Sequence, residues 1–457
     1  MKNNMTDMTT GSPAKHILLF ALPTLIGNIF QQVYNLADSI IVGCFVGKDA
    51  FAAVGATGSI TFLFFALCNG IGGGGGIIAS QYFGAHDDKN VKKCIVNTGF
   101  IMMIVPLLFG LIGFISAPAL LRILGTPDAI LSDSIMYTRY MCIGLFFVSL
   151  YNYLSNMLRA LGDSKTPLMF LIISTIINII LDVVFVVYLS LGISGAAIAT
   201  VISQFLSALL CGIFALRTNP YFRFTKEDFK ITFKMSYSII RLGVPLSVQF
   251  GLIAISSMAV QRIVNSFGTV VVAAFTATNR IEQLIHQPYT TLGASLSTYS
   301  GQNFGAGRKD RVYQGYKTGI WMMSVLTLVL FAGMQLFGKL ITSLFVEDTE
   351  VIRLGAMGLR ITSFFYFTLG MIYVVRGVLT GIGDALFQLI NGIVEVIGRF
   401  TIPILMTKYM GFGSSGIWIS AGIVWALSGA SAWYRYYTFF QKKLPSDTKR
   451  IIPCYRN

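Results

Sequence analysis

Long apolar runs dominate this chain and restrict what it can fold into. Twelve such runs, from 17–43 to 415–438, reach the roughly 20 residues that a helix needs to cross a bilayer. Of the 457 residues, 54% are hydrophobic and 12% are charged, which leaves too little polar surface for a water-soluble globule. We therefore predict an all-α polytopic membrane protein with twelve transmembrane helices.

Lysine and arginine gather on one side of this predicted topology. With the N-terminus placed inside, the inner segments hold 24 of these residues and the outer loops hold 5. Because basic loops stay in the cytoplasm, we expect a multi-pass protein of the cell (inner) membrane with both termini cytoplasmic. The net charge of +15 arises largely from these segments, and no basic helix or aromatic-interleaved basic patch indicates nucleic-acid binding.

An internal repeat with a shift of 221 residues divides the chain in two. It pairs residues across several apolar runs, among them Gln81 with Gln302, Arg139 with Arg360, and Asp163 with Asp384. Each half holds six predicted helices, an even number, so the two lobes insert in the same orientation as a parallel repeat. We predict lobes at 1–216 and 242–440, a cytoplasmic inter-lobe linker at 217–241, and a basic cytoplasmic tail at 441–457.

A polar stripe runs along the first predicted helix. Gln31, Tyr34, Asn35 and Asp38 stand at i, i+3, i+4 and i+7, so they share one face of the helix. An acid inside a membrane helix is costly and counts as a functional candidate by default. We predict a functional role for Asp38, and we take Gln31, Tyr34 and Asn35 as candidates to line a substrate cleft.

A second intramembrane acid, Asp182, has polar neighbours of its own. Asn178 lies one helical turn before it, and Thr200 and Gln204 are four residues apart on the next predicted helix. A carboxylate without a cationic partner in a low dielectric favours its neutral form, so it can take up and release a proton. The oxygens of Asp38, Asn178, Asp182 and Thr200 would also suit Na⁺, so both coupling ions stay open. Gln204 is a further cleft candidate.

The second half lacks these groups. The repeat places Pro403 opposite Asp182 and Ala421 opposite Thr200. We therefore expect ion coupling to be confined to the first half.

The second half carries charges of its own. Glu395 and Arg399 are four residues apart, and we predict that they form a structural ion pair. Glu282 has Arg280 close by in the sequence, which leaves two interpretations open. It is either part of an ion pair that stabilises the lobe or a cleft-facing site for a cation.

Several kinds of enzyme are disfavoured by the sequence. The glycine run 70–76 lacks the Gly-Lys-Ser/Thr of a nucleotide-binding loop, and membrane-helix glycines usually serve close packing. A prenyl transferase would need an Asp-Asp-x-x-Asp motif, which does not follow Asp87. The cysteines and histidines show no metal-ligand spacing. We expect no enzymatic activity and no cofactor.

Several local motifs, taken together, resemble one family of membrane proteins. They are the proline in the first and seventh predicted helices (Pro23 and Pro245), the Gln-x-Phe-Gly-Ala ends at 81–85 and 302–306, Leu-Gly-Asp at 161–163, and Asn-Ile-Ile-Leu-Asp at 178–182. In this order, and with the duplicated six-helix pattern, they resemble a multidrug and toxic compound extrusion (MATE) transporter. The resemblance covers nearly the whole chain.

The resemblance implies an antiporter that exports amphipathic, often cationic drugs in exchange for H⁺ or Na⁺. In the branch that keeps its coupling acids in the N-terminal lobe, the matching positions here are Tyr34, Asp38, Asn178, Asp182 and Thr200. The other branch has an acid in the seventh helix, and the predicted helix 236–264 contains none. A flippase for lipid-linked precursors of the same superfamily is the alternative. We expect the protein to work in the lipid bilayer as a monomer, with small-molecule drugs as its partners.

Overall fold

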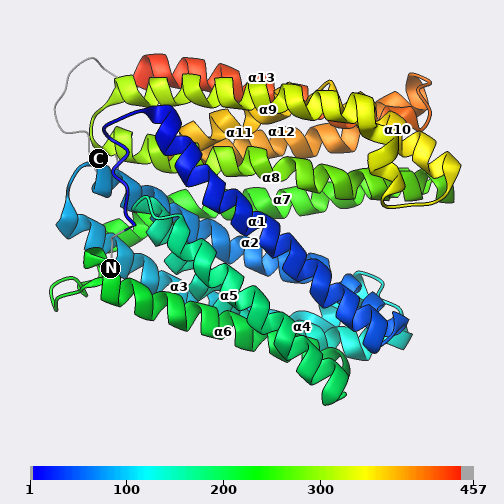
Figure 1. Cartoon of the computed structure of the whole chain (residues 1–457), viewed down its shortest axis with the longest axis horizontal. Coiled ribbons are helices and arrows are strands. Elements are labelled where there is room, and N and C mark those ends of the chain that lie inside the picture. Colours follow the sequence, from blue (N-terminus) through cyan, green and yellow to red (C-terminus); the bar gives the residue numbers. More distant parts are fainter. Residues whose placement is uncertain (1–3, 444–457) are drawn as a thin grey trace. The chain divides into compact units, whose positions relative to one another are not determined.

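The computed structural model describes residues 4–443, with only the backbone of Leu36, Ser39, Ala254 and 439–443. These residues form helices joined by short turns and loops (Figure 1). The α-helices are α1 (Pro13–Phe45), α2 (Lys48–Gly84), α3 (Asp88–Ile123), α4 (Asp128–Ala160), α5 (Lys165–Asp182), α6 (Gly192–Thr218), α7 (Phe233–Asn265), α8 (Thr269–Gly305), α9 (Lys309–Ser343), α10 (Thr349–Ser363), α11 (Tyr366–Gly381), α12 (Ala385–Ile404) and α13 (Ser415–Lys443). Two π-helical segments, Val183–Tyr188 and Leu405–Tyr409, continue α5 and α12, and a short 3₁₀-helix covers Pro220–Phe222.

The helices account for most of the predicted membrane spans. Within the described residues, ten helices are long and apolar enough to cross a membrane, or eleven if α10 and α11, which meet at a 52° bend, form one span. The helix missing from the predicted twelve is α8. It carries Asn279, Arg280, Glu282 and His286 near its middle, and these polar side chains lower its hydropathy. The length and composition of these helices thus confirm an all-helical membrane protein with ten or eleven candidate spans among the described residues.

The backbone carries the same repeat as the sequence. Residues with a positive φ recur 221 positions apart, in the pairs Gly47 and Gly268, His86 and Gly307, Gly162 and Gly383, Ser190 and Gly411, and Gly192 and Gly413. The π-helical segments also correspond, because Val183 and Leu405 begin them at matching places in α5 and α12. Since positive φ is unfavourable for most residues, its recurrence indicates that the two halves share their turn geometry.

Contacts between residues divide the chain into two compact units. Unit 1 contains 4–7 and 22–248, and unit 2 contains 8–21 and 249–443, so α1 and α7 each contribute to both. The predicted linker is a folded part of unit 1. There, Asn97 Oδ1 accepts hydrogen bonds from the Thr232 backbone N–H at 2.9 Å and from Ser236 Oγ at 3.2 Å. The predicted basic tail 441–457 lies almost wholly outside the described residues.

Glycines bring two helices of unit 1 into very close contact. A Cβ atom added at Gly74 would lie 2.6 Å from the backbone nitrogen of Gly243 and 2.7 Å from the carbonyl oxygen of Ile239. Such backbone contact between α2 and α7 leaves no room for a side chain, which is the usual reason for glycine in a membrane helix. The predicted packing role of the glycine run is confirmed at this crossing.

The start of the chain is held to unit 2 by a buried arginine. Arg311 of α9 donates to the carbonyl oxygens of Met8 at 3.0 Å and Thr10 at 3.2 Å, and to Asn303 Oδ1 at 2.9 Å. The Asn303 amide also donates to the Met8 carbonyl at 3.1 Å, and Gln302 accepts from the Met8 backbone N–H at 2.9 Å. The segment before α1 is therefore tied down by side chains as well as by apolar packing.

We expect Arg311→Ala to destabilise the protein by about 1–3 kcal/mol, because it leaves buried acceptors without a donor. Arg308→Ala is the matched control. Arg308 and its partner Asp310 are half-exposed, so their loss should cost less than about 1 kcal/mol. Thermal unfolding of the purified protein in detergent compares the two. Equal midpoints for both variants would show that Arg311 does not hold the segment.

Candidate functional site

Five of the predicted site residues lie together in unit 1, on three helices. Asp38 belongs to α1, Asn178 and Asp182 to the last turns of α5, and Thr200 and Gln204 to one face of α6. All five are buried, with 8% of Asp38 and 0% of Asp182 exposed. The sequence places each pair one turn apart. Helix α5 packs on α6, and Asp182, Thr200 and Gln204 all lie near the side chain of Tyr34.

The charges within this site are of one sign. The carboxylates of Asp38 and Asp182 lie close enough to repel each other, and neither forms an ion pair among the described residues. The Tyr34 hydroxyl lies near both acids and near the side chains of Thr200 and Gln204. Burial of two acids with no cation beside them is unfavourable unless a proton or a metal cation neutralises them.

Several polar atoms at the site have no hydrogen-bond partner in the described structure. They are Tyr34 Oη, Asp38 Oδ1, both amide atoms of Asn178, both carboxylate oxygens of Asp182, and Thr200 Oγ1. Buried polar groups are nearly always paired, so an unpartnered set of this kind needs an explanation. Carboxylate, amide and hydroxyl oxygens fit a proton or a hard cation such as Na⁺. Among the described residues, no group of three or more His, Cys, Asp or Glu could hold a metal ion.

The structure adds Tyr137 of α4 to this group. Tyr137 is buried, and its hydroxyl lies near Tyr34, Asp38 and Asp182. No signal in the sequence singles it out, because it stands in an ordinary apolar helix and reaches the acids only through the packing of α4.

Two members of the predicted polar stripe lie outside this cluster. Gln31 and Asn35 are exposed, whereas Asp38, at the end of the stripe, is buried. The 3.6-residue period places the side chains of the stripe on one face of the helix, but it does not specify which of them are buried. Their predicted role in a substrate cleft stays a prediction.

In unit 2, Glu395 has a different partner from the one predicted. Its Oε1 accepts from Arg376 Nη2 of α11 at 2.5 Å and from Ser428 Oγ of α13 at 3.0 Å, and both charged side chains are buried. Arg376 Nε also donates to Asn391 at 2.5 Å. Arg399 instead donates to Ser256 Oγ at 3.4 Å and Ser257 Oγ at 3.3 Å. The expected Glu395–Arg399 pair is thus replaced, because a residue of a neighbouring helix offers better geometry than one on the same helix.

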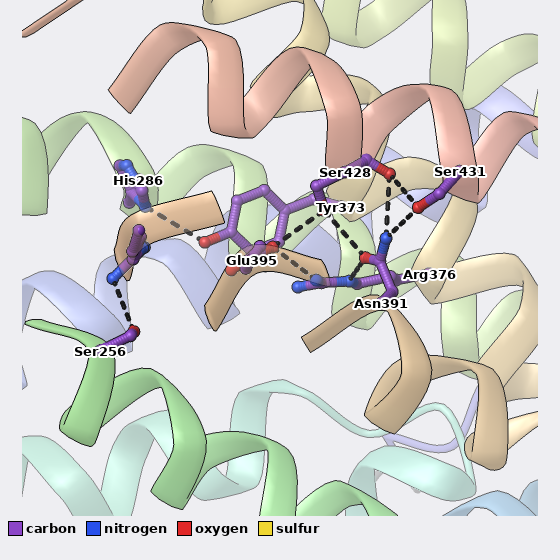
Figure 2. A network of polar contacts seen from close by, with 9 residues as sticks. Ser256, His286, Tyr373, Arg376, Asn391, Glu395, Ser428 and Ser431 are labelled. Carbon is purple, nitrogen blue, oxygen red and sulfur yellow. Dashed lines mark hydrogen bonds and ion pairs between the residues drawn. The ribbon is translucent and has the colours of Figure 1, made fainter. Parts of the chain in front are cut away.

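Figure 2 shows how this network extends through unit 2. At one end, Arg376 and Ser428 donate to the Glu395 carboxylate, and Asn391 joins Arg376 to Ser431. His286 and Ser256 lie at the other end, where His286 Nδ1 is 3.1 Å from the hydroxyl of Tyr373. Glu282, one turn before His286 on α8, has a buried Oε1 without a hydrogen-bond partner, and Thr362 and Arg399 lie near its carboxylate.

Comparisons with known proteins agree with one another. The MatE family model matches the chain twice, at 23–184 and 245–403. Over 433 residues, the chain is 30% identical to the "Probable multidrug resistance protein YpnP" of Bacillus subtilis (strain 168), covering 94% of this chain and 96% of that protein. It is 23% identical over 460 residues to the "Multidrug export protein MepA" of Staphylococcus aureus (strain NCTC 8325 / PS 47), covering 99% and 100% of the two chains.

The fold also matches solved structures. One is described as "Outward-facing conformation of a multidrug resistance MATE family transporter of the MOP superfamily", with a TM-score of 0.89, 23% identity, and coverage of 98% of this chain and 100% of that one. Another, "Crystal structure of MATE in the bent conformation", has a TM-score of 0.89 at 24% identity and covers 96% and 98% of the two chains.

We expect Asp38→Asn and Asp182→Asn to leave the thermal stability unchanged or higher, because each removes a buried charge that has no partner. Asp163→Ala is the control for an acid with a structural role. Asp163 accepts from the backbone N–H groups of Lys165 and Thr166 at 3.1 and 2.9 Å, so its loss should cost about 0.5–2 kcal/mol. Melting temperatures of the three variants and the wild type, measured in detergent, test both expectations. If Asp182→Asn destabilised the protein as much as Asp163→Ala, its carboxylate would have structural partners.

Proposed function

The chain belongs to the MATE family, and on this premise we propose that it exports amphipathic, often cationic drugs in exchange for H⁺ or Na⁺. Both the family match and the similarity to multidrug resistance proteins identify it as a multi-pass membrane transporter for multidrug efflux, not an enzyme. The coupling ion, the drugs and the residues that bind the ion are the parts we propose.

The observation that carries this proposal is the set of unpartnered polar atoms around Asp38 and Asp182. Without a bound ion, two neighbouring carboxylates in a low dielectric repel each other. A proton or Na⁺ would remove that repulsion and would use the oxygens of Asn178 and Thr200. Ion binding would therefore favour a packing in which α1, α5 and α6 hold the acids together, and ion release would favour one in which they separate.

Alternating access would follow if the drug and the ion favour different arrangements of the same helices. A ligand shifts a conformational equilibrium only by its difference in affinity for the two states. An ion that binds the closely packed acids would displace a drug whose site needs α1 in another position. Pro23 interrupts the hydrogen-bond ladder of α1 near its change from one unit to the other, so it is a natural place for such a change.

We further propose the topology predicted from the sequence. Adding α8 and counting α10 with α11 as one span gives twelve spans, in lobes at 1–216 and 242–440. Both termini would then be cytoplasmic. The coupling branch would be the one with its acids in the N-terminal lobe, since the matching positions of unit 2 are Pro403 and Ala421. We propose that a monomer is sufficient for transport.

The alternative, a flippase for lipid-linked precursors, would need basic groups that can bind phosphate. Of the two arginines in the unit 2 network, Arg376 is already bound to Glu395 and Asn391. That leaves one guanidinium, Arg399, whereas a pyrophosphate carries several negative charges. The small number of arginines available in this network favours drug export over the flippase.

The direct test is efflux of a fluorescent organic cation from proteoliposomes, first under a proton gradient and then under a sodium gradient. We expect one gradient to drive efflux by the wild type. Asp38→Asn and Asp182→Asn should each lower the coupled rate about tenfold or more, equivalent to roughly 1.4 kcal/mol. Asp49→Asn is the matched control, because Asp49 is exposed at the start of α2 and should not affect the rate. Undiminished coupled efflux by Asp38→Asn would rule out the proposed site.

A further inference from the structure

An apolar groove lies on unit 1, between α3 and α4. It is lined by residues of 106–114 on α3 and 142–146 on α4, and its volume is about 280 Å³. At the rise of an α-helix, the lining stretch of α3 is about 12 Å long. Both helices are candidate membrane spans, so the acyl chains of a bilayer can reach the groove.

The groove has a closed floor and open apolar sides. At the floor, a Cβ atom added to Gly110 would lie 2.7 Å from the carbonyl oxygen of Cys142, so the two helices touch there. At the sides, Leu107, Leu111 and Ile143 are each more than half exposed. A flexible hydrocarbon chain in such a groove makes van der Waals contacts with both helices without leaving a polar group unpaired.

A cation lies at one end of the groove. Arg139 of α4 stands one helical turn before Ile143, and its guanidinium carbon is 5.0 Å from the centroid of the Phe114 ring, which lines the groove. Its Nε donates to the Phe114 carbonyl oxygen at 3.4 Å. Among the described residues, Arg139 forms no ion pair with an acid. One long hydrogen bond leaves most of its five N–H donors available to a ligand.

The charge of Arg139 indicates what the groove binds. Arginines within membrane spans are rare, and their long side chains reach toward the polar headgroups. The planar guanidinium matches the oxygens of a phosphate, with which it forms charge-assisted hydrogen bonds. An organic cation would be repelled at this end of the groove. A molecule that joins an anionic phosphate to a hydrocarbon chain complements both the cation and the apolar sides.

The corresponding place in unit 2 is filled by side chains. The repeat of 221 residues equates Gly110 with Phe331 and Ile143 with Phe364. These two phenylalanine rings meet edge to face, with centroids 5.1 Å apart. The shared scaffold therefore does not require an open groove, and the opening in unit 1 results from its own residues.

We propose that this groove is a binding site for an anionic glycerophospholipid of the surrounding bilayer. Arg139 binds the phosphate, and one acyl chain lies along α3 and α4. The lipid is neither the exported drug nor the coupling ion, so the proposal stands independently of the export function above.

The test uses two lipids with the same acyl chains, phosphatidylglycerol and diacylglycerol, each with a photoreactive diazirine in one chain. The purified full-length protein in detergent is titrated with each lipid and irradiated, and mass spectrometry measures the labelling of 106–114 and 142–146. We expect saturable labelling by phosphatidylglycerol. Arg139→Gln should raise its half-saturating concentration about tenfold, equivalent to roughly 1.4 kcal/mol, and should not affect diacylglycerol, which has no phosphate. Arg139→Lys should have an intermediate effect, because it keeps the charge but loses the planar fork.

Arg360→Gln is the matched control. Arg360 is the exposed counterpart of Arg139 in unit 2, and its loss should leave the labelling of the groove unchanged. Ile143→Phe introduces the side chain that unit 2 has at this place, so it should lower labelling by both lipids. Because each variant is judged with two lipids on one preparation, partial unfolding does not imitate a loss of phosphate binding.

An equal effect of Arg139→Gln on both lipids, or no effect on phosphatidylglycerol, would overturn the proposal. So would wild-type labelling of the groove that does not saturate. Displacement of the phosphatidylglycerol label by the fluorescent organic cation used for efflux would identify the groove as a drug site instead, and would also contradict the proposal.

Discussion

The main constraint on unit 1 is the unfavourable free energy of burying charged carboxylates that have no cation beside them. Asp38 and Asp182 are both buried and repel each other, and several polar atoms around them lack hydrogen-bond partners. A protein of marginal stability rarely keeps such a cluster unless a ligand completes it. The proposal of an ion-coupled exporter follows from this incomplete cluster together with the family match, since neither alone specifies where the ion binds.

Unit 2 shows that the scaffold does not require this arrangement. It has the same turn geometry and the same π-helical break in the fifth helix of its half, yet it carries Pro403 opposite Asp182. One of its own buried acids, Glu395, is paired with Arg376 and accepts a hydrogen bond from Ser428 of α13, while Arg376 also donates to Asn391 of α12. The two halves therefore share a backbone and differ in their charges. This difference supports the proposal that ion coupling is confined to unit 1.

Features of the chain that depend on local spacing could be predicted from the sequence, and features that depend on packing could not. Hydropathy and the repeat predicted the helices and the corresponding turns, and the four-residue spacing predicted that Asn178 and Asp182 share a face. The partner of Glu395 was mispredicted because Arg376 lies on another helix, 19 residues earlier in the chain. Tyr137 was missed for the same reason. The span count also differs, because α8 has the length of a membrane span but carries polar residues near its middle that lower its hydropathy.

The central claim is that drug and ion compete through the carboxylates of unit 1. It is tested most directly by measuring ion release when a drug binds to the purified transporter in detergent, with a pH indicator in weak buffer for protons and radioactive sodium for Na⁺. The account predicts that drug binding to the wild type releases one of these ions, and that the double variant Asp38→Asn/Asp182→Asn binds the drug without releasing either. Ion release by the double variant equal to that of the wild type would contradict it.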